Sequence, residues 1–383
     1  MLREQTHTTA TNSITQATDK SGIPKAVAAP AQLATNRPAK ETSPARPDSG
    51  SAQRTGRANV SQTLPESAIG DTNSVAQSDQ ALQRLVTKTN GGAIPQGSFP
   101  RPVRDTMELQ IALARQAISP GSVDGVMGSQ TRLALLAFQR REGLPPTGAL
   151  DATTRERLLL SHAPLTSYTV ASNDLTRLKP LSKTWLGKSL QSGLEYETIL
   201  ELVAEKGRAS PNLIRRLNPG VDWTNVITGT SVSLPDITNA PASRAGFVVI
   251  SLGEKRLQTF DANTNLLAHF PCSIAARVEK RPAGELRVTA IAPNPDYTFN
   301  PEVFPESAEA RQIKTKLMLP PGPNNPVGTA WISLDLPGYG MHGTPSPEQV
   351  GRTESHGCFR LANWNAEFLL KLVWVGMPVY VEP

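Results

Sequence analysis

The sequence of 383 residues predicts a multidomain α+β protein with a disordered N-terminal tail, a three-helix domain, a small α/β module and a mainly β C-terminal domain. Three observations predict this order. The first aromatic residue is Phe99, helical hydrophobic periodicity begins near Asp105, and short apolar runs typical of strands begin near Gly246. We assign the four parts to residues 1–100, 101–163, 164–240 and 245–383 in that order.

Composition and charge exclude several classes of protein. The formal net charge is +6, from 39 Lys and Arg against 33 Asp and Glu, and the excess lies mostly in the tail. A nucleic-acid-binding protein would gather this charge on a folded face or in a long run, and the sequence shows neither. Only two cysteines are present, Cys272 and Cys358, which excludes a disulfide-rich scaffold and a four-cysteine metal site. No apolar stretch is long enough to span a membrane.

Residues 1–100 consist mainly of Thr, Ser, Ala, Pro, Asn and Gln with scattered charges. Such a segment cannot bury enough apolar surface to offset the entropy lost on ordering, so it predicts a disordered tether. The residues after Met1 do not form the basic start and apolar run of a secretory signal.

The three-helix prediction rests on helix caps. Asp105 and Glu108 have the spacing of a capping box and predict a helix that extends to Ala117. A glycine-rich turn follows, where the chain reversal needs residues that tolerate positive φ. Ser129 and Asp151 are candidate caps for two further helices.

This region resembles the peptidoglycan-binding domain family, whose pattern runs Leu-Gln, Asp-Gly-x-x-Gly, Thr-x-x-Ala, Phe-Gln, Gly-Leu and Gly-x-Leu-Asp. The resemblance implies binding to the wall polymer, although many such domains act only as spacers, and a generic three-helix core is the alternative. The matching residues are Leu109, Gln110, Asp124, Gly125, Gly128, Thr131, Ala134, Phe138, Gln139, Gly143, Leu144, Gly148 and Asp151.

The next module is predicted as helices over 196–207 and 210–217, an Asn-Pro-Gly turn at 218–220 and a closing strand at 232–234. It resembles a diverged LysM module, because a Leu-Asn-Pro turn follows the second helix and residues 168–170 resemble a LysM first strand. About 25 residues then intervene before the helices. Glycan binding and a purely structural connector both remain open for this module.

The C-terminal region is predicted as a β-meander followed by further strands, with one helix packed on them. We expect that helix to begin with Asn363 as its cap and to end near Gly376 and Pro378. The expected strands cover residues 247–252, 256–260, 266–274, 285–291, 330–334 and 379–381.

A short segment of this region concentrates reactive side chains. Residues 341–361 contain His342, His356 and Cys358, which are two of the five histidines and one of the two cysteines. A free thiol is only a few per cent thiolate at neutral pH, and a positioned imidazole raises that fraction by accepting the proton. Gly357 permits a tight turn in which backbone amides near Cys358 can face a developing oxyanion. The composition therefore predicts a nucleophile loop.

Three other readings of these residues compete. His342, His356 and Cys358 could bind zinc, although the segment lacks an obvious fourth ligand. Cys358 could form a disulfide with Cys272, which would abolish the nucleophile. A buried thiol beside structural histidines is the third, and Cys272, in an apolar strand, fits that description better than Cys358.

His-Gly-Thr followed by Ser-His-Gly-Cys-x-Arg-Leu resembles the signature of the L,D-transpeptidase (YkuD) catalytic domain family. Residues 281–284 and 319–328 resemble its upstream Thr-Pro-x-Gly and Pro-Pro-Gly-x-x-Asn-Pro-x-Gly segments, and the likeness covers residues 246–383. It implies that Cys358 is the nucleophile and His342 the base. It also implies that the Gly343 carbonyl orients the imidazole, and the motif is completed by Ser355, His356, Gly357 and Arg360. Two positions depart from the pattern, Arg281 and Phe359.

The resemblance implies an acyltransferase that forms a cysteine thioester with a peptidoglycan tetrapeptide stem and releases D-alanine. The acceptor could be a second stem, giving a 3→3 cross-link, an envelope protein lysine, or water, giving a carboxypeptidase. The alternatives are a catalytically idle wall-binding protein and a hydrolase of existing wall links. We expect no cofactor and no metal, and peptidoglycan stems and glycan as partners. The substrate implies a location in the cell envelope, in the periplasm, so we expect either that the true start lies upstream of Met1 or that the sequence is trimmed.

Overall fold

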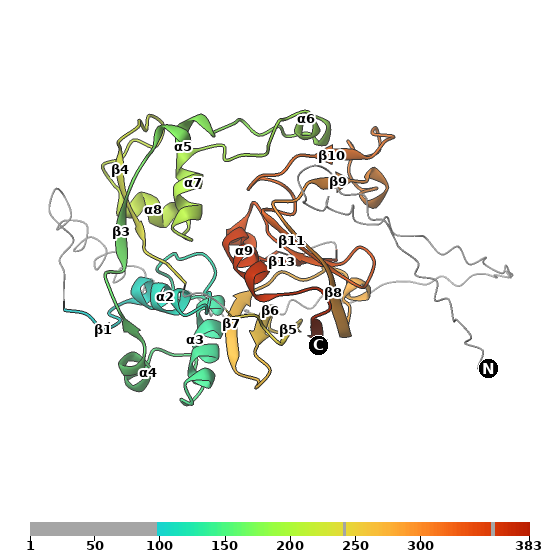
Figure 1. The fold of residues 1–383 in the computed structure, drawn as a ribbon. Helices are drawn as coiled ribbons and strands as arrows, with labels where there is room; N and C mark the ends of the chain where they lie inside the picture. Colours follow the sequence, from blue (N-terminus) through green and yellow to red (C-terminus); the bar gives the residue numbers. More distant parts are fainter. Residues whose placement is uncertain (1–97, 240–242, 354–356) are drawn as a thin grey trace, which may run out of the picture.

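The computed structural model describes residues 98–239, 243–353 and 357–383. Nearly all of the predicted tether, residues 1–100, therefore lies outside the described residues. Figure 1 shows most of the N-terminal helices on one side of the molecule and the C-terminal sheet on the other, with helix α6, Trp185–Ser189, next to strand β10, Leu317–Leu319, of the C-terminal domain. Among the described helices, none is both long and apolar enough to cross a membrane.

The first unit contains the three predicted helices and a short strand pair. Asp105 and Asp151 are N-caps whose carboxylates accept hydrogen bonds from the third helical amides, each at 2.8 Å. The first helix ends before Ala117, because that residue turns the chain with φ of +60°. The cap of the second helix is Gly128 rather than Ser129, which is its first residue. The elements are β1 Arg101–Pro102, α2 Thr106–Arg115, α3 Ser129–Arg141, α4 Ala152–Arg157 and β2 Leu159–Leu160.

The second unit has the predicted strand, helix, helix, strand order, and its two long strands pair antiparallel. The residues between the first strand and the helices fold into two short helices, and the second of these contacts strand β10 of the C-terminal domain (Figure 1). The likeness to LysM stays a prediction. The elements are β3 Leu165–Thr169, α5 Ser172–Thr176, α6 Trp185–Ser189, α7 Ile199–Lys206, α8 Pro211–Leu217 and β4 Ser231–Pro235.

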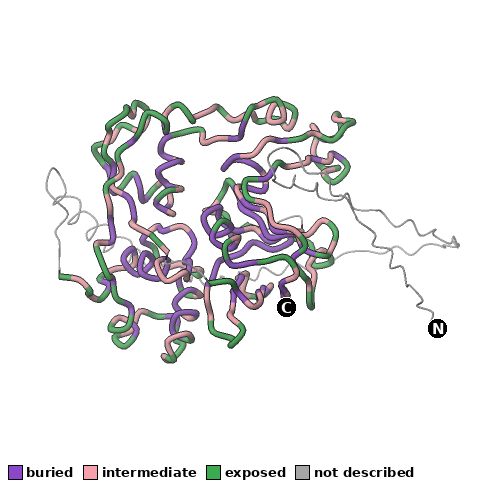
Figure 2. The backbone as a smooth tube through the Cα atoms, viewed as in Figure 1, coloured by how far each residue is buried: buried purple, intermediate pink, exposed green. Residues whose placement is uncertain are grey.

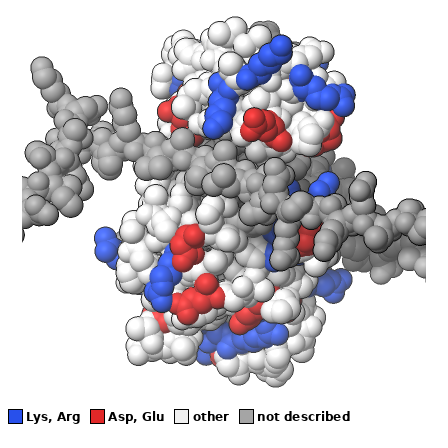
Figure 3. Space-filling model, turned by 90° about the vertical axis from the view of Figure 1, so that its right-hand side faces the viewer, with Lys and Arg blue, Asp and Glu red and all other residues white. Residues whose placement is uncertain are grey.

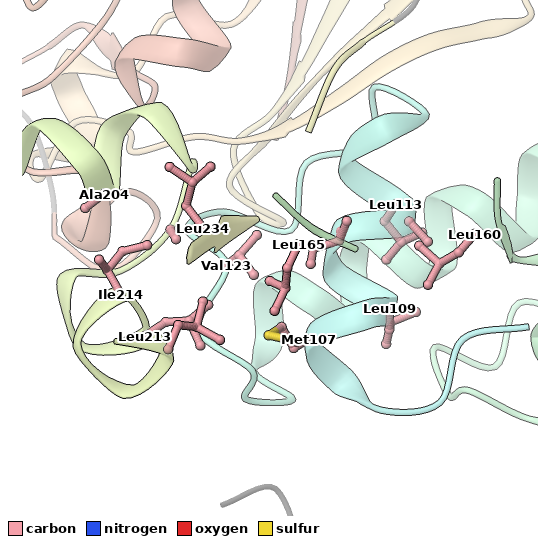
Figure 4. Close-up of a cluster of buried hydrophobic side chains, with 14 of the residues drawn as sticks. Met107, Leu109, Leu113, Val123, Leu160, Leu165, Ala204, Leu213, Ile214 and Leu234 are labelled. Carbon is pink, nitrogen blue, oxygen red and sulfur yellow. The ribbon is translucent and has the colours of Figure 1, made fainter. Parts of the chain in front are cut away.

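The two N-terminal units share one hydrophobic cluster, so they pack as a single body. Met107 and Val123 of the first unit belong to the same cluster as Leu165, Leu213 and Ile214 of the second (Figure 4). All five are buried, and their burial removes apolar surface from water on both sides of the predicted boundary.

The C-terminal domain is mainly β, as predicted. Its eight-stranded sheet has the order β13-β12-β11-β8-β14-β5-β6-β7, in which β12 with β13 and β14 with β5 pair parallel and the other neighbours antiparallel. A separate pair, β9 with β10, lies beside it. The strands are β5 Phe247–Ser251, β6 Arg256–Phe260, β7 Leu266–Pro271, β8 Gly284–Pro293, β9 Tyr297–Phe299, β10 Leu317–Leu319, β11 Ala330–Leu334, β12 Gly340–His342, β13 Phe359–Arg360 and β14 Pro378–Glu382.

Helix α9, Asn363–Leu372, packs its apolar stripe on this sheet. Phe368, Leu369 and Leu372 lie in one buried cluster with Ile332 and Met341 of the sheet, and Figure 2 shows this buried layer between helix and strands. The N-cap of the helix is Ala362, not the predicted Asn363, which is the first helical residue. The Asn363 side chain is thereby available to other parts of the domain.

The N-terminal body is hydrogen-bonded to the edge of the large sheet. The His269 amide on the edge strand β7 donates to the Ala117 carbonyl at 2.9 Å, and the Ser119 amide donates to the His269 carbonyl at 2.8 Å. Asn365 of α9 donates to the Ser119 hydroxyl at 3.0 Å. The edge strand is therefore covered by the chain's own N-terminal body, which protects it from pairing with other chains.

The surface is electrostatically mixed. On the face drawn in Figure 3, Lys and Arg side chains are interspersed with Asp and Glu. That face does not present the basic stripe that nucleic-acid binding requires.

Candidate active site

Strands β12 and β13 bring the predicted base and nucleophile together. His342 is the last residue of β12, and Cys358 immediately precedes β13. In their parallel pairing Met341 lies opposite Phe359 and His342 opposite Arg360. Since side chains alternate along a strand, the buried Met341 and Phe359 face the core, while His342, Cys358 and Arg360 share the other face.

A backbone carbonyl fixes the imidazole of His342. Its Nδ1 lies 2.6 Å from the Gly343 carbonyl oxygen. A carbonyl only accepts hydrogen bonds, so this contact assigns the ring proton to Nδ1 and leaves the Nε2 lone pair as the proton acceptor. Trp331 on the neighbouring strand β11 stacks on the imidazole with ring centroids 5.5 Å apart, which further restricts the ring.

Gly343 is held from two sides. Its amide donates to the Ala330 carbonyl at 3.1 Å, and a Cβ at this position would lie 2.3 Å from Oδ1 of Asn363. The Asn363 side chain is itself buried, accepts from the Thr329 amide at 3.3 Å and donates to the Pro323 carbonyl at 3.2 Å. The glycine is therefore required here by a close approach, and Asn363 sets the place of the carbonyl that orients His342.

The thiol of Cys358 is half-buried and neutral at rest. It donates a hydrogen bond to the Gly338 carbonyl at 3.4 Å. Burial raises the pKa of Cys358 to about 11, while a backbone hydrogen bond from Gly340 and the positive charge of Arg360 act in the opposite direction. The last two groups are therefore the ones that stabilise a thiolate when it forms.

The base is also neutral at rest. Burial and the charge of Arg360 lower the pKa of His342 to about 3, and the bond to Gly343 only partly opposes them. At neutral pH this face of the sheet therefore holds a thiol and an uncharged imidazole whose Nε2 can accept a proton. Such a pair suits general-base activation of the nucleophile during attack.

The remaining predicted site residues are placed as follows. Arg360 is half-buried, and its backbone exchanges hydrogen bonds of 3.0 and 2.9 Å with Ser273. A Cβ at Gly357 would contact the ring of Tyr339 at 3.6 Å. Ser355 and His356 lie outside the described residues.

The structure also bears on the alternative roles predicted for Cys272 and Cys358. Neither cysteine is part of a disulfide, so the predicted alternative of a Cys272–Cys358 disulfide is wrong. Cys272 is fully buried, and burial raises the pKa of its thiol far above the usual value, as expected of a structural cysteine. Within residues 98–239, 243–353 and 357–383, no cluster of three metal-ligating side chains occurs.

Sequence reasoning missed Trp331, Tyr297 and Tyr339 as neighbours of the reactive pair. The charge of Cys358 acts on the pKa of both tyrosines, so both phenols lie near the thiol. The Tyr339 hydroxyl donates to the Lys280 carbonyl at 2.9 Å. None of these residues belongs to a sequence motif of the site. Trp331 reaches it through the pairing of β11 with β12, whereas Tyr339 lies in the turn before β12 and Tyr297 in the separate strand β9.

Two parts of the chain match models of known protein families. Residues 245–381 match the family model of the L,D-transpeptidase catalytic domain (YkuD). Residues 104–158 match the model of a peptidoglycan binding domain family.

Curated relatives agree with the first match. A Bacillus licheniformis protein named as the L,D-transpeptidase YkuD is 26% identical over 184 residues, which cover 48% of this chain and 93% of the relative. A Salmonella typhimurium protein named as the L,D-transpeptidase ErfK/SrfK is 29% identical over 180 residues, which cover 46% of this chain and 57% of the relative. The match thus spans little more than half of the second relative.

Among solved structures, an L,D-transpeptidase from Mycobacterium smegmatis aligns with 41% of this chain and 65% of its own at 19% identity. The TM-score of that alignment is 0.29, which is too low to support an inference.

Proposed function

We propose that this protein is a cysteine-dependent acyltransferase of peptidoglycan, because residues 245–381 match the model of the L,D-transpeptidase catalytic domain and residues 104–158 match that of a peptidoglycan binding domain. The proposal assigns Cys358 as nucleophile and His342 as general base. The observation that carries it is the 2.6 Å contact of His342 Nδ1 with the Gly343 carbonyl, which directs the Nε2 lone pair to proton transfer.

The first half-reaction acylates the enzyme. His342 Nε2 takes the thiol proton as sulfur bonds to the carbonyl carbon of the third residue in a tetrapeptide stem. The amide bond to D-alanine then breaks, and the imidazolium returns its proton to the departing amine. The products are free D-alanine, a thioester on Cys358 and a neutral imidazole.

The second half-reaction returns the thiol. An acceptor amine attacks the thioester carbonyl, His342 takes the amine proton, and the carbon–sulfur bond breaks as the proton passes to sulfur. The leaving thiolate is stabilised by the Gly340 hydrogen bond and the charge of Arg360. A stem amine gives a 3→3 cross-link, an envelope protein lysine gives an anchored protein, and water gives a carboxypeptidase.

An idle wall-binding protein is the alternative of a different class. The oriented imidazole favours the enzyme, since peptidoglycan binding alone has no need of a base on the same face of the sheet as a thiol. The proposed substrate places the protein in the cell envelope, and we propose the periplasm.

The two cysteines give a matched test. Isolated sacculi are incubated with the protein and with its Cys358→Ala and Cys272→Ala forms, then digested and analysed by mass spectrometry. We expect new 3→3 linked or D-alanine-free stems with the wild type and with Cys272→Ala, and none with Cys358→Ala. Equal loss in both variants, with both folds intact by circular dichroism, would contradict the assignment of the nucleophile.

A further inference from the structure

A cavity of about 470 Å³ lies where the N-terminal body meets the sheet domain. Its walls come from α3 on one side and, on the other, from the turn between β5 and β6 and the adjoining parts of β6 and β7. Figure 1 shows α3 next to β7. His269 of β7 lines this cavity, as does Gly351 in the loop that leads to Cys358. The cavity is therefore distinct from the reactive pair but shares a loop with it.

A chain of hydrogen bonds determines the tautomer of His269. Arg256 donates to Oε1 of Gln258, which fixes the orientation of the Gln258 amide. The Nε2 of that amide lies 3.2 Å from Nδ1 of His269, so Nδ1 accepts and the ring proton lies on Nε2. Burial and the charges of Arg256 and Arg140 lower the pKa of His269 to about 3, so the ring stays neutral at neutral pH.

The Nε2–H of His269 is a buried donor that has no acceptor among the residues that the structure describes. His269 is 1% exposed, and its Nε2 is buried without a hydrogen-bond partner. Buried polar groups are nearly always hydrogen-bonded, so an orphaned donor on a cavity wall indicates a site for an external acceptor.

The charges around the cavity specify that acceptor. Arg132, Lys255 and Arg256 line it, against a single lining carboxylate, Glu254, which pairs with Arg256. Arg140 and Arg141 line a second cavity of about 300 Å³ further along α3. A neutral imidazole N–H can donate a hydrogen bond to an anionic oxygen without first taking up a proton. The surrounding arginine and lysine side chains supply the opposite charge, so the site suits an anionic oxygen.

We infer that this cavity binds a free carboxylate of a peptidoglycan stem peptide, with His269 Nε2–H as the buried donor and Arg132 and Lys255 as the cationic rim. This inference rests on the proposed function, which supplies stems as substrates. The carboxylate belongs to a stem next to the one that reacts, because the reacting stem occupies the site at Cys358. When the protein binds a neighbouring stem of the same polymer in this cavity, the effective concentration of the reacting stem at Cys358 rises.

The test uses the full chain with Cys358→Ala, so that stems bind without reacting. The protein is labelled with ¹⁵N-histidine and titrated with a soluble tetrapeptide stem, while the His269 and His342 ring signals are followed by NMR. We expect the His269 Nε2 signal to shift with the free peptide and not with the same peptide amidated at its carboxylates. We expect Arg132→Gln with Lys255→Gln to weaken this response at least tenfold, and the exposed Arg157→Gln in α4 to leave it unchanged.

Three outcomes would overturn the inference. The first is an unmoved His269 signal at peptide concentrations that saturate the His342 response, and the second is an equal response to the amidated peptide. The third is an equal affinity for acetate or inorganic phosphate, which would show a general anion site. Acylation of wild-type Cys358 is measured in parallel, so failure of the proposed function appears as absent acylation, whereas failure of the cavity alone leaves acylation intact.

Discussion

Replacing Gly343 with alanine tests how the base is oriented. The new Cβ would lie 2.3 Å from Oδ1 of Asn363, whereas ordinary contact begins at 3.4 Å, so the carbonyl of residue 343 or the amide of Asn363 must move by about 1 Å. A displacement of that size at a catalytic group lowers rates by about 100-fold. We therefore expect Gly343→Ala to slow the acylation of Cys358 by about two orders of magnitude.

The assay is the rate of acyl-enzyme formation with a soluble stem or a small β-lactam, followed by intact mass, with thermal unfolding in parallel. Gly220→Ala is the matched control, because a Cβ there meets nothing within 4 Å. The double variant Gly343→Ala, Asn363→Ala removes the clash and should recover part of the rate. A wild-type rate in Gly343→Ala with its fold intact would refute the orienting role of this carbonyl.

Three further predictions concern pH and packing. Because the pKa of His342 is about 3 and that of Cys358 about 11, both side chains stay neutral between pH 5 and 9, and the acylation rate should be nearly constant over that range. A tenfold rise in the rate per pH unit would instead indicate a preformed thiolate. Burial raises the pKa of Glu205 from 4.5 to about 8, so the protonated side chain contributes its full stability below about pH 4.5, and this contribution is lost as the pH rises towards 8. Chemical denaturation of Glu205→Gln should therefore show no such fall in the free energy of unfolding between pH 4.5 and 8. Trp185 stacks on Phe299 at 4.3 Å, so Trp185→Ala should lower the melting temperature by several degrees while the exposed Leu190→Ala does not.

The sequence predicted the elements whose signals are local. The caps Asp105 and Asp151, the helix predicted over 210–217 and the strands predicted over 256–260 and 330–334 follow from periodicity, caps and turns, and the structure confirms them. A side chain that caps a helix or alternates along a strand acts within a few residues, so its signal survives in one sequence.

Non-local features could not be predicted in this way. Strands β12 and β13 have three and two residues, which is too short for periodicity, and they exist because each pairs with a distant partner. Asn363 was read as a helix cap, but its side chain reaches Gly343 instead. The backbone hydrogen bonds between His269 of β7 and residues Ala117 and Ser119 join two units that the sequence presents as separate.

The reactive residues themselves were predicted better than their surroundings. Spacing of His342 and Cys358 identified them, because their chemistry needs particular residue types. The pairing register of β12 with β13 sets both on one face, and Trp331 of β11 stacks on the imidazole. No local sequence pattern signals either feature.

The central claim is that Cys358 forms a thioester with a stem and expels D-alanine. The most direct measurement is the intact mass of the full chain quenched during turnover with a tetrapeptide stem, followed by peptide mapping of the adduct. The account predicts a mass gain equal to the stem minus D-alanine, located on Cys358, with Cys272 unmodified. An adduct that retains D-alanine, or one located on Cys272, would contradict it.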